Sequence, residues 1–211
     1  MRLFLDCDQT LYRNSELVGE IRSRMVLFMA NVFPGKSLEE VTAIRVDYLR
    51  RYGTTMAGLL ANQNIHPKDF LSFVHEVDQA KYLVHDPRLV NTLTNLKMPI
   101  FIASNAPRSH VKRVLELLGI SHIPEKIFGI EDFGFDGKPS PNSYRVMLER
   151  TGTKPQDALI VDDYVINVRG AVEAGMNACI LGDEDEGFKP KIDDIYQLEG
   201  FINSMKMRTR A

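Results

Sequence analysis

The sequence predicts an α/β protein in which a helical insertion follows the first strand of a doubly wound, mainly parallel sheet. A short apolar run at residues 3–5 opens the chain, and a long stretch with helical periodicity follows it. From residue 86 onward, short apolar runs alternate with segments whose apolar residues recur at helical spacing. Strands that alternate with helices are typical of a parallel sheet covered on both faces.

The insertion is expected at residues 15–86, and the sheet domain at residues 1–14 and 87–211. Two segments of the insertion, "ELVGEIRSRMVLFMANVF" and "SLEEVTAIRVDYLRRYG", have apolar residues at helical spacing. The second segment begins with Ser37 and has Glu40 three residues later, a capping-box pattern that is typical of a helix start. No run of strand-like residues stands out in the insertion, so we expect it to be helical.

Four apolar runs are the expected strands of the sheet: "LFL", "PIFIA", "ALIV" and "ACIL". Helical segments lie between them, and Gly119 and Gly152 are expected to close two of these helices. After the last run we expect a polar loop, "GDEDEGFKP", and then one amphipathic helix that leads to a basic end.

The composition limits the kind of partner. The 211 residues have a formal net charge of -2, and the charged residues are spread along the chain, which argues against nucleic acid or an anionic membrane as partner. No apolar stretch approaches the roughly 20 residues needed to span a bilayer. Cys7 and Cys179 lie far apart in apolar stretches, as expected of buried thiols in a reducing compartment. We therefore expect a cytoplasmic protein, a monomer or small homo-oligomer, that binds a small molecule.

Polar side chains collect at the ends of three expected strands. Ligands of open parallel sheets bind outside the carboxyl ends of the strands, where these side chains would meet. A lysine in the Gly- and Pro-rich loop "DFGFDGKPSP" is long enough to reach the same edge. The candidate residues are Asp6, Asp8 and Thr10 after the first strand, Ser104 and Asn105 after the second, Asp162 and Asp163 after the third, and Lys138 in the loop.

These residue types favour one kind of chemistry. Carboxylates with no histidine or thiolate among them suit Mg²⁺ rather than Zn²⁺. Without a cation, converging carboxylates would repel one another and raise one another's pKa values. A site with Mg²⁺, an ammonium group and a hydroxyl is matched to a phosphate dianion, because it neutralises the charge on a transferring phosphoryl group.

Four short motifs, "DCDQT", "ASN", "GKPSP" and "VDD", occur in this order along the chain. Together they resemble the signature of the haloacid dehalogenase superfamily of phosphohydrolases, which has a Rossmann-like core. The resemblance implies that Asp6 attacks phosphorus to form an aspartyl-phosphate, and that Asp8 serves as general acid and then general base. Superfamily members that attack carbon lack the second aspartate of the first motif, so Asp8 favours a phosphatase over a dehalogenase.

The same resemblance implies roles for the remaining motif residues. Ser104 and Lys138 would hold the phosphoryl oxygens, while Thr10 would steady the turn or contact substrate. Mg²⁺ would be bound by Asp6, by the backbone carbonyl of Asp8, and by Asp162 or Asp163. Asn105 is a further candidate for substrate binding, although it and Ser104 are also suited to cap the helix that follows them.

The insertion lies where this superfamily places its cap, a lid that closes over the site and selects the substrate. Within it, "YLRRYGTTMAGL" and "HEVDQAKYLVHDPRL" resemble the subgroup of pyrimidine 5'-nucleotidases. This second resemblance implies a nucleoside 5'-monophosphate as substrate, with Arg51, Tyr52, Thr54 and Thr55 near the base and ribose. The stretch is equally compatible with a helix end that only packs the cap.

Several alternatives remain open at the level of sequence. Phosphatases of sugar phosphates or phosphoglycolate, and phosphomutases, share the core and differ in the cap. A phospho-receiver module also uses Asp, Mg²⁺, Thr or Ser and Lys, but its phosphorylated Asp follows a later strand. A binding module that keeps the fold without turnover is a further alternative. The histidines of the chain show no metal-ligand spacing and lie outside the four motifs.

Overall fold

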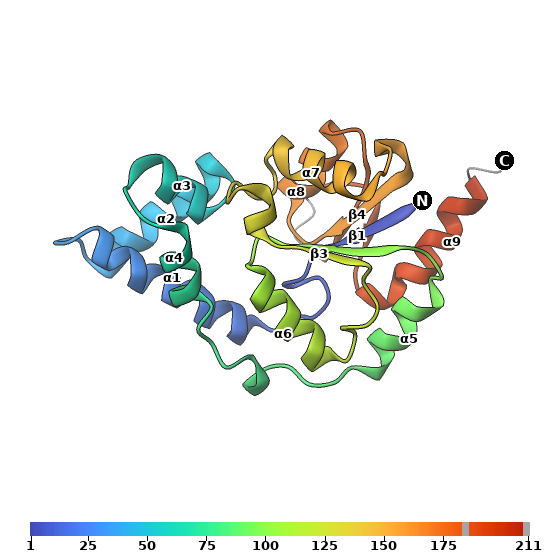
Figure 1. The fold of residues 1–211 in the computed structure, drawn as a ribbon, viewed down its shortest axis with the longest axis horizontal. Coiled ribbons are helices and arrows are strands. Elements are labelled where there is room, and N and C mark those ends of the chain that lie inside the picture. Colours follow the sequence, from blue (N-terminus) through green and yellow to red (C-terminus); the bar gives the residue numbers. More distant parts are fainter. Residues whose placement is uncertain (183–185, 209–211) are drawn as a thin grey trace.

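The computed structural model describes residues 1–182 and 186–208, and within them six strands form one sheet. Its order is β3-β2-β1-β4-β5-β6, and all five neighbouring pairs are parallel (Figure 1). The α/β fold with a mainly parallel sheet is therefore confirmed. The strands are β1 (Arg2–Leu5), β2 (Ile100–Ala103), β3 (Lys126–Phe128), β4 (Ala158–Asp162), β5 (Asn177–Leu181) and β6 (Lys191–Ile192).

Two strands at the edges of the sheet were not expected from the sequence. β3 has three residues with only Phe128 buried, and β6 has two residues, so neither contains an apolar run that predicts a strand. The tail also differs from the single helix that was expected. β6 and a short 3-10 turn, Ile195–Gln197, precede the terminal helix α9 (Leu198–Arg208). Residues 183–185 of the expected polar loop and 209–211 of the expected basic end lie outside the described residues.

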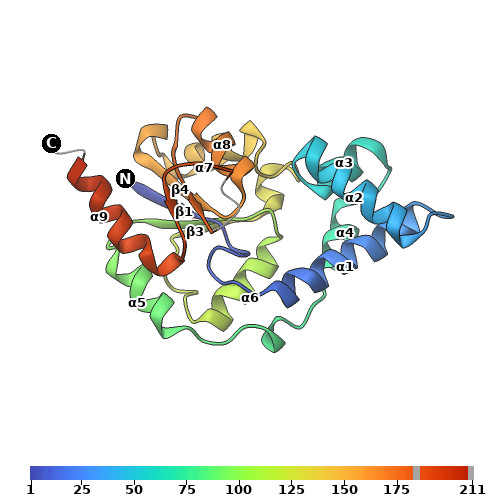
Figure 2. The same cartoon turned by 180° about the vertical axis from the view of Figure 1, so that it is seen from behind.

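Helices cover both faces of the sheet because alternate strand residues point to opposite sides. Leu3 and Leu5 of β1 pack in one apolar cluster with residues of α5 (Pro87–Asn95), α6 (Arg108–Leu118) and α9. Phe4 packs in a second cluster with residues of α7 (Pro141–Thr151) and α8 (Val165–Glu173). The result is a three-layer arrangement in which the central strands are buried on both faces (Figures 1 and 2).

The insertion forms a lobe of four helices beside the sheet (Figure 1). We call α1 to α4 the cap helices. The predicted capping box at the start of α2 is present, since Ser37 Oγ accepts a hydrogen bond from the backbone N–H of Glu40 and the Glu40 carboxylate accepts one from the N–H of Ser37. The cap helices are α1 (Ser15–Val32), α2 (Leu38–Tyr52), α3 (Thr55–Asn62) and α4 (Pro67–Val74), and a 3-10 turn at Gln79–Lys81 leads back to the sheet domain.

Two further expectations concern the cysteines and membranes. Cys7 and Cys179 are buried free thiols, and burial raises the pKa of both. Cys7 packs with Leu3 and Leu5, so the alternation of the strand turns it toward the apolar core.

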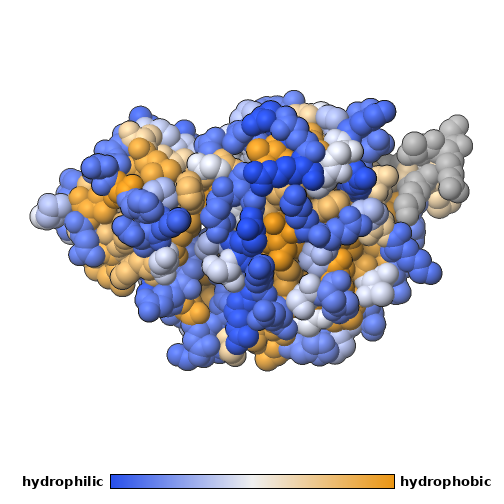
Figure 3. Space-filling model, in the orientation of Figure 1, coloured by the Kyte–Doolittle hydropathy of each residue, from blue (hydrophilic) through white to orange (hydrophobic). Residues whose placement is uncertain are grey.

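Among the described helices, none combines the length and apolar character needed to cross a membrane. The face in Figure 3 mixes hydrophilic residues with hydrophobic ones, and some of the hydrophobic residues lie over the cap lobe.

Candidate active site

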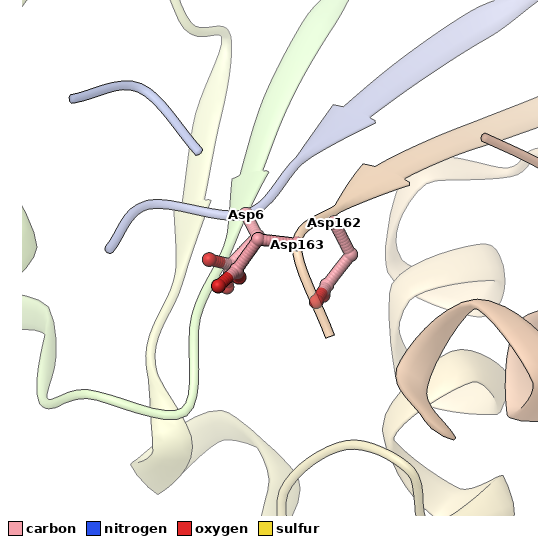
Figure 4. Close-up of side chains that lie close together, drawn as sticks. All are labelled: Asp6, Asp162 and Asp163. Carbon is pink, nitrogen blue, oxygen red and sulfur yellow. The ribbon is translucent and has the colours of Figure 1, made fainter. Parts of the chain in front are cut away.

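The site is built at the carboxyl edge of the sheet, where β1 lies between β2 and β4. Leu5, the last residue of β1, is in register with Ile102 of β2 and Val161 of β4. The residues that follow these positions therefore emerge at the same edge. Asp6 extends from β1, and Asp162 and Asp163 come from the end of β4 (Figure 4).

Three carboxylates converge there, as the sequence predicted. One oxygen from each of Asp6, Asp162 and Asp163 can be chosen so that all three lie within 4.8 Å of one another. The Lys138 ammonium is fully buried among them and donates to Asp6 Oδ1 at 2.8 Å and to Asp162 Oδ2 at 2.5 Å. Burial raises the pKa of Asp6 and of Asp163, although Lys138 opposes the rise in both. The site thus holds more carboxylates than its single ammonium can neutralise.

The two neighbouring aspartates at the end of β4 have different surroundings. Asp162 is fully buried, and besides Lys138 its oxygens accept hydrogen bonds from the backbone N–H of Tyr164 at 2.9 Å and from Asn167 Nδ2 at 2.9 and 3.1 Å. The carboxylate of Asp163 is only half-buried, and no side chain of another described residue donates to it. Asp162 therefore serves to hold Lys138 and Asn167, while Asp163 keeps oxygens available.

This donor set fits a hard divalent cation. Asp6 and Asp163 offer carboxylate oxygens at one edge, and Asn167 adds a buried side-chain oxygen that has no hydrogen-bond partner. Oxygen donors without thiolate or imidazole are those that Mg²⁺ prefers. A bound cation would also relieve the repulsion that contributes to the raised pKa values of Asp6 and Asp163.

Asp8 is held by two side chains that both donate to its Oδ1 atom. One donor is the Tyr12 hydroxyl and the other is His110 Nε2, at 2.7 Å. Burial alone would raise the pKa of Asp8, but the nearby His110 and these hydrogen bonds outweigh burial and hold it at about 2. With Oδ1 occupied twice, Oδ2 is the oxygen of Asp8 that remains free to act in the cavity.

His110 was missed by the sequence analysis, which assigned the histidines no role. It is buried in the first turns of α6, and its Nδ1 atom lies 2.5 Å from the side-chain amide of Gln79. The ring of His75, at the end of α4, packs edge-on against it with 5.0 Å between centroids. Burial is the main cause that lowers the pKa of His75, the nearby His110 is the second, and the resulting pKa is about 4. The only available signal in the sequence was the position of His110 six residues after Ser104, on the helix that starts at the site.

Ser104 and Asn105 reach the site from β2 in different ways. Ser104 is buried, faces the cavity, and accepts a hydrogen bond from the N–H of Ala106 at 3.0 Å. Asn105 clamps the backbone of Lys138, because its Oδ1 accepts from the Lys138 N–H and its Nδ2 donates to the Lys138 carbonyl, both at 2.7 Å. Gly137 has φ +70, and a Cβ there would lie 2.7 Å from Asn105 Oδ1. The glycine in "GKPSP" thus permits the close approach that positions Lys138.

A cavity of about 300 Å³ lies between this edge and the cap helices. Asp6, Asp8, Ser104 and Asp163 form part of its wall on the sheet side. The cap side is mainly apolar, with contributions from α1, α2, α3 and α4. A ligand in this cavity would contact the candidate catalytic groups and the cap at the same time.

The predicted cap residues divide into two groups. Thr54 and Thr55 are buried and line the cavity, and Thr54 also caps α3 by accepting from the N–H of Ala57. Arg51 instead lies on the outer surface, where it pairs with Asp47, and Tyr52 packs edge-on against Tyr48. Neither Arg51 nor Tyr52 lines the cavity.

Thr10 is also placed away from the cavity. It is buried, and its hydroxyl has no hydrogen-bond partner, while its N–H donates to the carbonyl of Cys7 in the turn after β1. This position agrees with the alternative that Thr10 steadies the turn.

A parallel α/β sheet with a helical cap and an acidic cluster at its strand ends has its ligand cavity between the sheet edge and the cap. Residues 2–175 match the family of haloacid dehalogenase-like hydrolases, and the chain belongs to this family.

Two curated relatives of this chain are named as phosphatases. The chain is 28% identical over 207 residues to a glyceraldehyde 3-phosphate phosphatase of Methanopyrus kandleri, and the match covers 91% of this chain and 88% of that protein. It is 32% identical over 97 residues to a phosphoglycolate phosphatase of Aquifex aeolicus, covering 44% and 45% of the two chains. These comparisons confirm the family, but they do not confirm the pyrimidine 5'-nucleotidase subgroup.

The fold has counterparts among solved structures. One is the HAD-hydrolase YfnB of Bacillus subtilis, solved bound to magnesium, which superposes with a TM-score of 0.58 at 19% identity and covers 96% of this chain and 98% of that one. At this identity the likeness shows the shared fold alone.

Proposed function

We propose that the protein is a Mg²⁺-dependent phosphomonoesterase that works through a phosphorylated Asp6. The observation that carries this proposal is the convergence of Asp6, Asp8 and the Asp163 carboxylate on one cavity, with the Lys138 ammonium buried behind them. A nucleophile, a proton carrier and a cation site within one cavity are the groups that stepwise phosphoryl transfer requires.

In the first step, an oxygen of Asp6 attacks phosphorus and the bond from phosphorus to the leaving oxygen breaks. Because the pKa of Asp8 is held at about 2, its free Oδ2 first takes up the proton that the phosphate ester carries as its monoanion and then gives it to the leaving oxygen, so the product is an alcohol. In the second step, Asp8 takes a proton from water, the water oxygen attacks phosphorus, and the bond to Asp6 breaks to release inorganic phosphate. Lys138 keeps Asp6 oriented and favours its ionised form throughout.

Asp6, Asp163 and the backbone carbonyl of Asp8 would hold Mg²⁺. The ion supplies positive charge next to the phosphoryl oxygens where negative charge develops. Asp162 is then a residue that positions Lys138 and Asn167 rather than a metal ligand, because its oxygens are already engaged in the structure.

Two substrate classes have specific support. Pyrimidine nucleoside 5'-monophosphates are supported by the resemblance of the cap sequence and by the presence of Thr54 and Thr55 in the cavity wall. Small sugar phosphates and phosphoglycolate fit at least as well, because relatives that match this chain are named as phosphatases of such compounds.

The test is release of inorganic phosphate by the purified protein from a panel that contains both substrate classes, with Mg²⁺ and with a chelator. We expect multiple turnovers with Mg²⁺ and none with the chelator. Asp6→Asn should abolish release while Asp69→Asn, an exposed aspartate on α4, should not. Chelator-resistant turnover would contradict the metal assignment, and full activity of Asp6→Asn would contradict the nucleophile. A single phosphorylation without turnover would indicate a receiver module instead.

A further inference from the structure

Two arginines of the cap face the same cavity as the candidate catalytic residues. On α1, Val18, Ile21, Arg22 and Met25 line the cavity, and their spacing of three and four residues marks one face of the helix. On α2, Arg45 and Leu49 line it, again four residues apart. Arg22, which is exposed, and Arg45, which is half-buried, therefore lie on the cavity-facing sides of two adjacent helices.

Neither arginine has a partner of opposite charge among residues 1–182 and 186–208. Within the described part of the chain, no hydrogen bond or ion pair involves the side chain of Arg22 or of Arg45. The Nε atom of Arg45 is buried and lacks any hydrogen-bond acceptor. Asp47, the nearest acidic residue on α2, is already paired with Arg50 and Arg51 on the outside of the cap.

The two like charges also affect each other. Burial, together with the charge of Arg22, lowers the pKa of Arg45. A half-buried charge with no counterion and a second cation close by is unfavourable for the folded protein, since a buried polar group without a partner loses its hydration and gains nothing. A ligand group with negative charge would supply what the structure lacks at this point.

We propose that Arg22 and Arg45 form a second anion site, which binds a carboxylate or second phosphate of the substrate while its reacting phosphoryl group lies at Asp6. This inference rests on the proposed function and narrows it to phosphate esters that carry a further anionic group. Guanidinium groups suit this task because their planar N–H donors match the oxygens of carboxylate and phosphate. The apolar side chains beside the half-buried Arg45 strengthen its interaction with an anion because they lower the local dielectric constant.

Binding of inert phosphonates tests the site without requiring turnover. The compounds are phosphonates whose chain ends in a carboxylate, each paired with a phosphonate of equal length that ends in a hydroxyl group. The dissociation constants of both members of each pair are measured by calorimetry in the presence of Mg²⁺. A series of chain lengths covers the distance between the two sites. For the best length, we expect the wild type to bind the carboxylate compound about 10- to 100-fold more tightly, the effect of a hydrogen bond to a charged group.

Variants assign that preference to the arginines. Arg45→Gln and Arg22→Gln should each remove most of the preference for the carboxylate while leaving binding of the hydroxyl compound within about threefold. Arg50→Gln, an exposed arginine on the same helix as Arg45, is the matched control and should keep the full preference. Since Nε of Arg45 has no partner to lose, Arg45→Gln should also unfold at the same denaturant concentration as the wild type or a higher one.

Three results would overturn the second anion site. The first is a wild type that shows no preference at any chain length. The second is an equal loss for both compounds in the arginine variants, which would mean that the arginines bind the phosphoryl group itself. The third is a marked loss of stability in Arg45→Gln, which would indicate a structural role. Failure of the proposed function would be distinguishable from all three results. It would show as an absence of phosphate release in the activity assay, however tightly the protein binds the phosphonates.

Discussion

Lys138 is predicted to be essential for the stability of the metal-free protein as well as for activity. Its ammonium is fully buried and donates to Asp6 at 2.8 Å and to Asp162 at 2.5 Å. Lys138→Met keeps the length and most of the volume of the side chain and removes the charge. The two carboxylates would then remain buried without their common partner.

The loss of unfolding free energy in Lys138→Met can be worked out from these contacts. A hydrogen bond to a charged group contributes about 1.5–3 kcal/mol, and two are lost. Breaking a buried ion pair by removing one partner costs about 3–5 kcal/mol, which agrees with this sum. We therefore expect Lys138→Met to lower the free energy of unfolding by about 4 kcal/mol near neutral pH.

The pH dependence gives a second criterion. Burial raises the pKa of Asp6, and loss of the ammonium removes the main opposing influence, so the pKa rises further in the variant. A carboxyl group whose folded pKa is raised stabilises the protein at low pH, and that stability is lost as the pH rises through the folded pKa. Because the pKa of Asp6 is already about 7 in the wild type, the difference in free energy of unfolding between variant and wild type should shrink as the pH falls through 7 and grow as the pH rises above it.

The assay is urea unfolding of wild type and variants in the presence of a chelator. Lys112→Met removes an exposed lysine on α6 and should change the free energy of unfolding by less than about 0.5 kcal/mol. If Lys138→Met behaved like this control, or if its loss of unfolding free energy did not depend on pH, the ion pairs of Lys138 would not stabilise the metal-free protein.

Two other predictions concern Asp8 and the packing of the cap. His110→Ala should lower kcat about 10-fold or more with little change in KM, because it removes a group that orients the proton carrier rather than one that binds substrate, whereas the exposed His122→Ala should leave both unchanged. A change in KM as large as the change in kcat would argue that His110 affects substrate binding rather than the orientation of Asp8. Gly58→Ala should destabilise the protein by about 1–2 kcal/mol in urea unfolding, since the new Cβ would lie 2.4 Å from Tyr48, while Gly200→Ala, which meets nothing within 4 Å, should not. A Gly58→Ala variant as stable as the wild type would show that α2 and α3 can move apart.

The predictable part of the fold is the part with strong periodicity. The four central strands are buried runs, and the capping box at Ser37 is a local pattern, so both could be recognised in the sequence. β3 and β6 could not, because strands of three and two residues at the edges owe their existence to the neighbouring strand rather than to their own residues.

The candidate active site could likewise be predicted only in part from the sequence. Its motif residues follow strands directly, so the parallel topology alone brings Asp6, Ser104 and Asp162 to one edge. His110 and Arg45 lie on helix faces, and their approach to the site depends on how α6 and α2 pack against it. Such tertiary placement leaves no local pattern that distinguishes these residues from other polar side chains on amphipathic helices.

The proposed function depends above all on transfer of the phosphoryl group to Asp6. Rapid acid quenching of the protein during turnover with Mg²⁺ and a hydrolysed ester, followed by peptide mass spectrometry, tests it most directly. We predict one acid-stable, base-labile phosphoryl group on the peptide that contains Asp6, and none in Asp6→Asn. Turnover at full rate without any phosphorylated peptide, or with the phosphoryl group on another residue, would contradict transfer to Asp6.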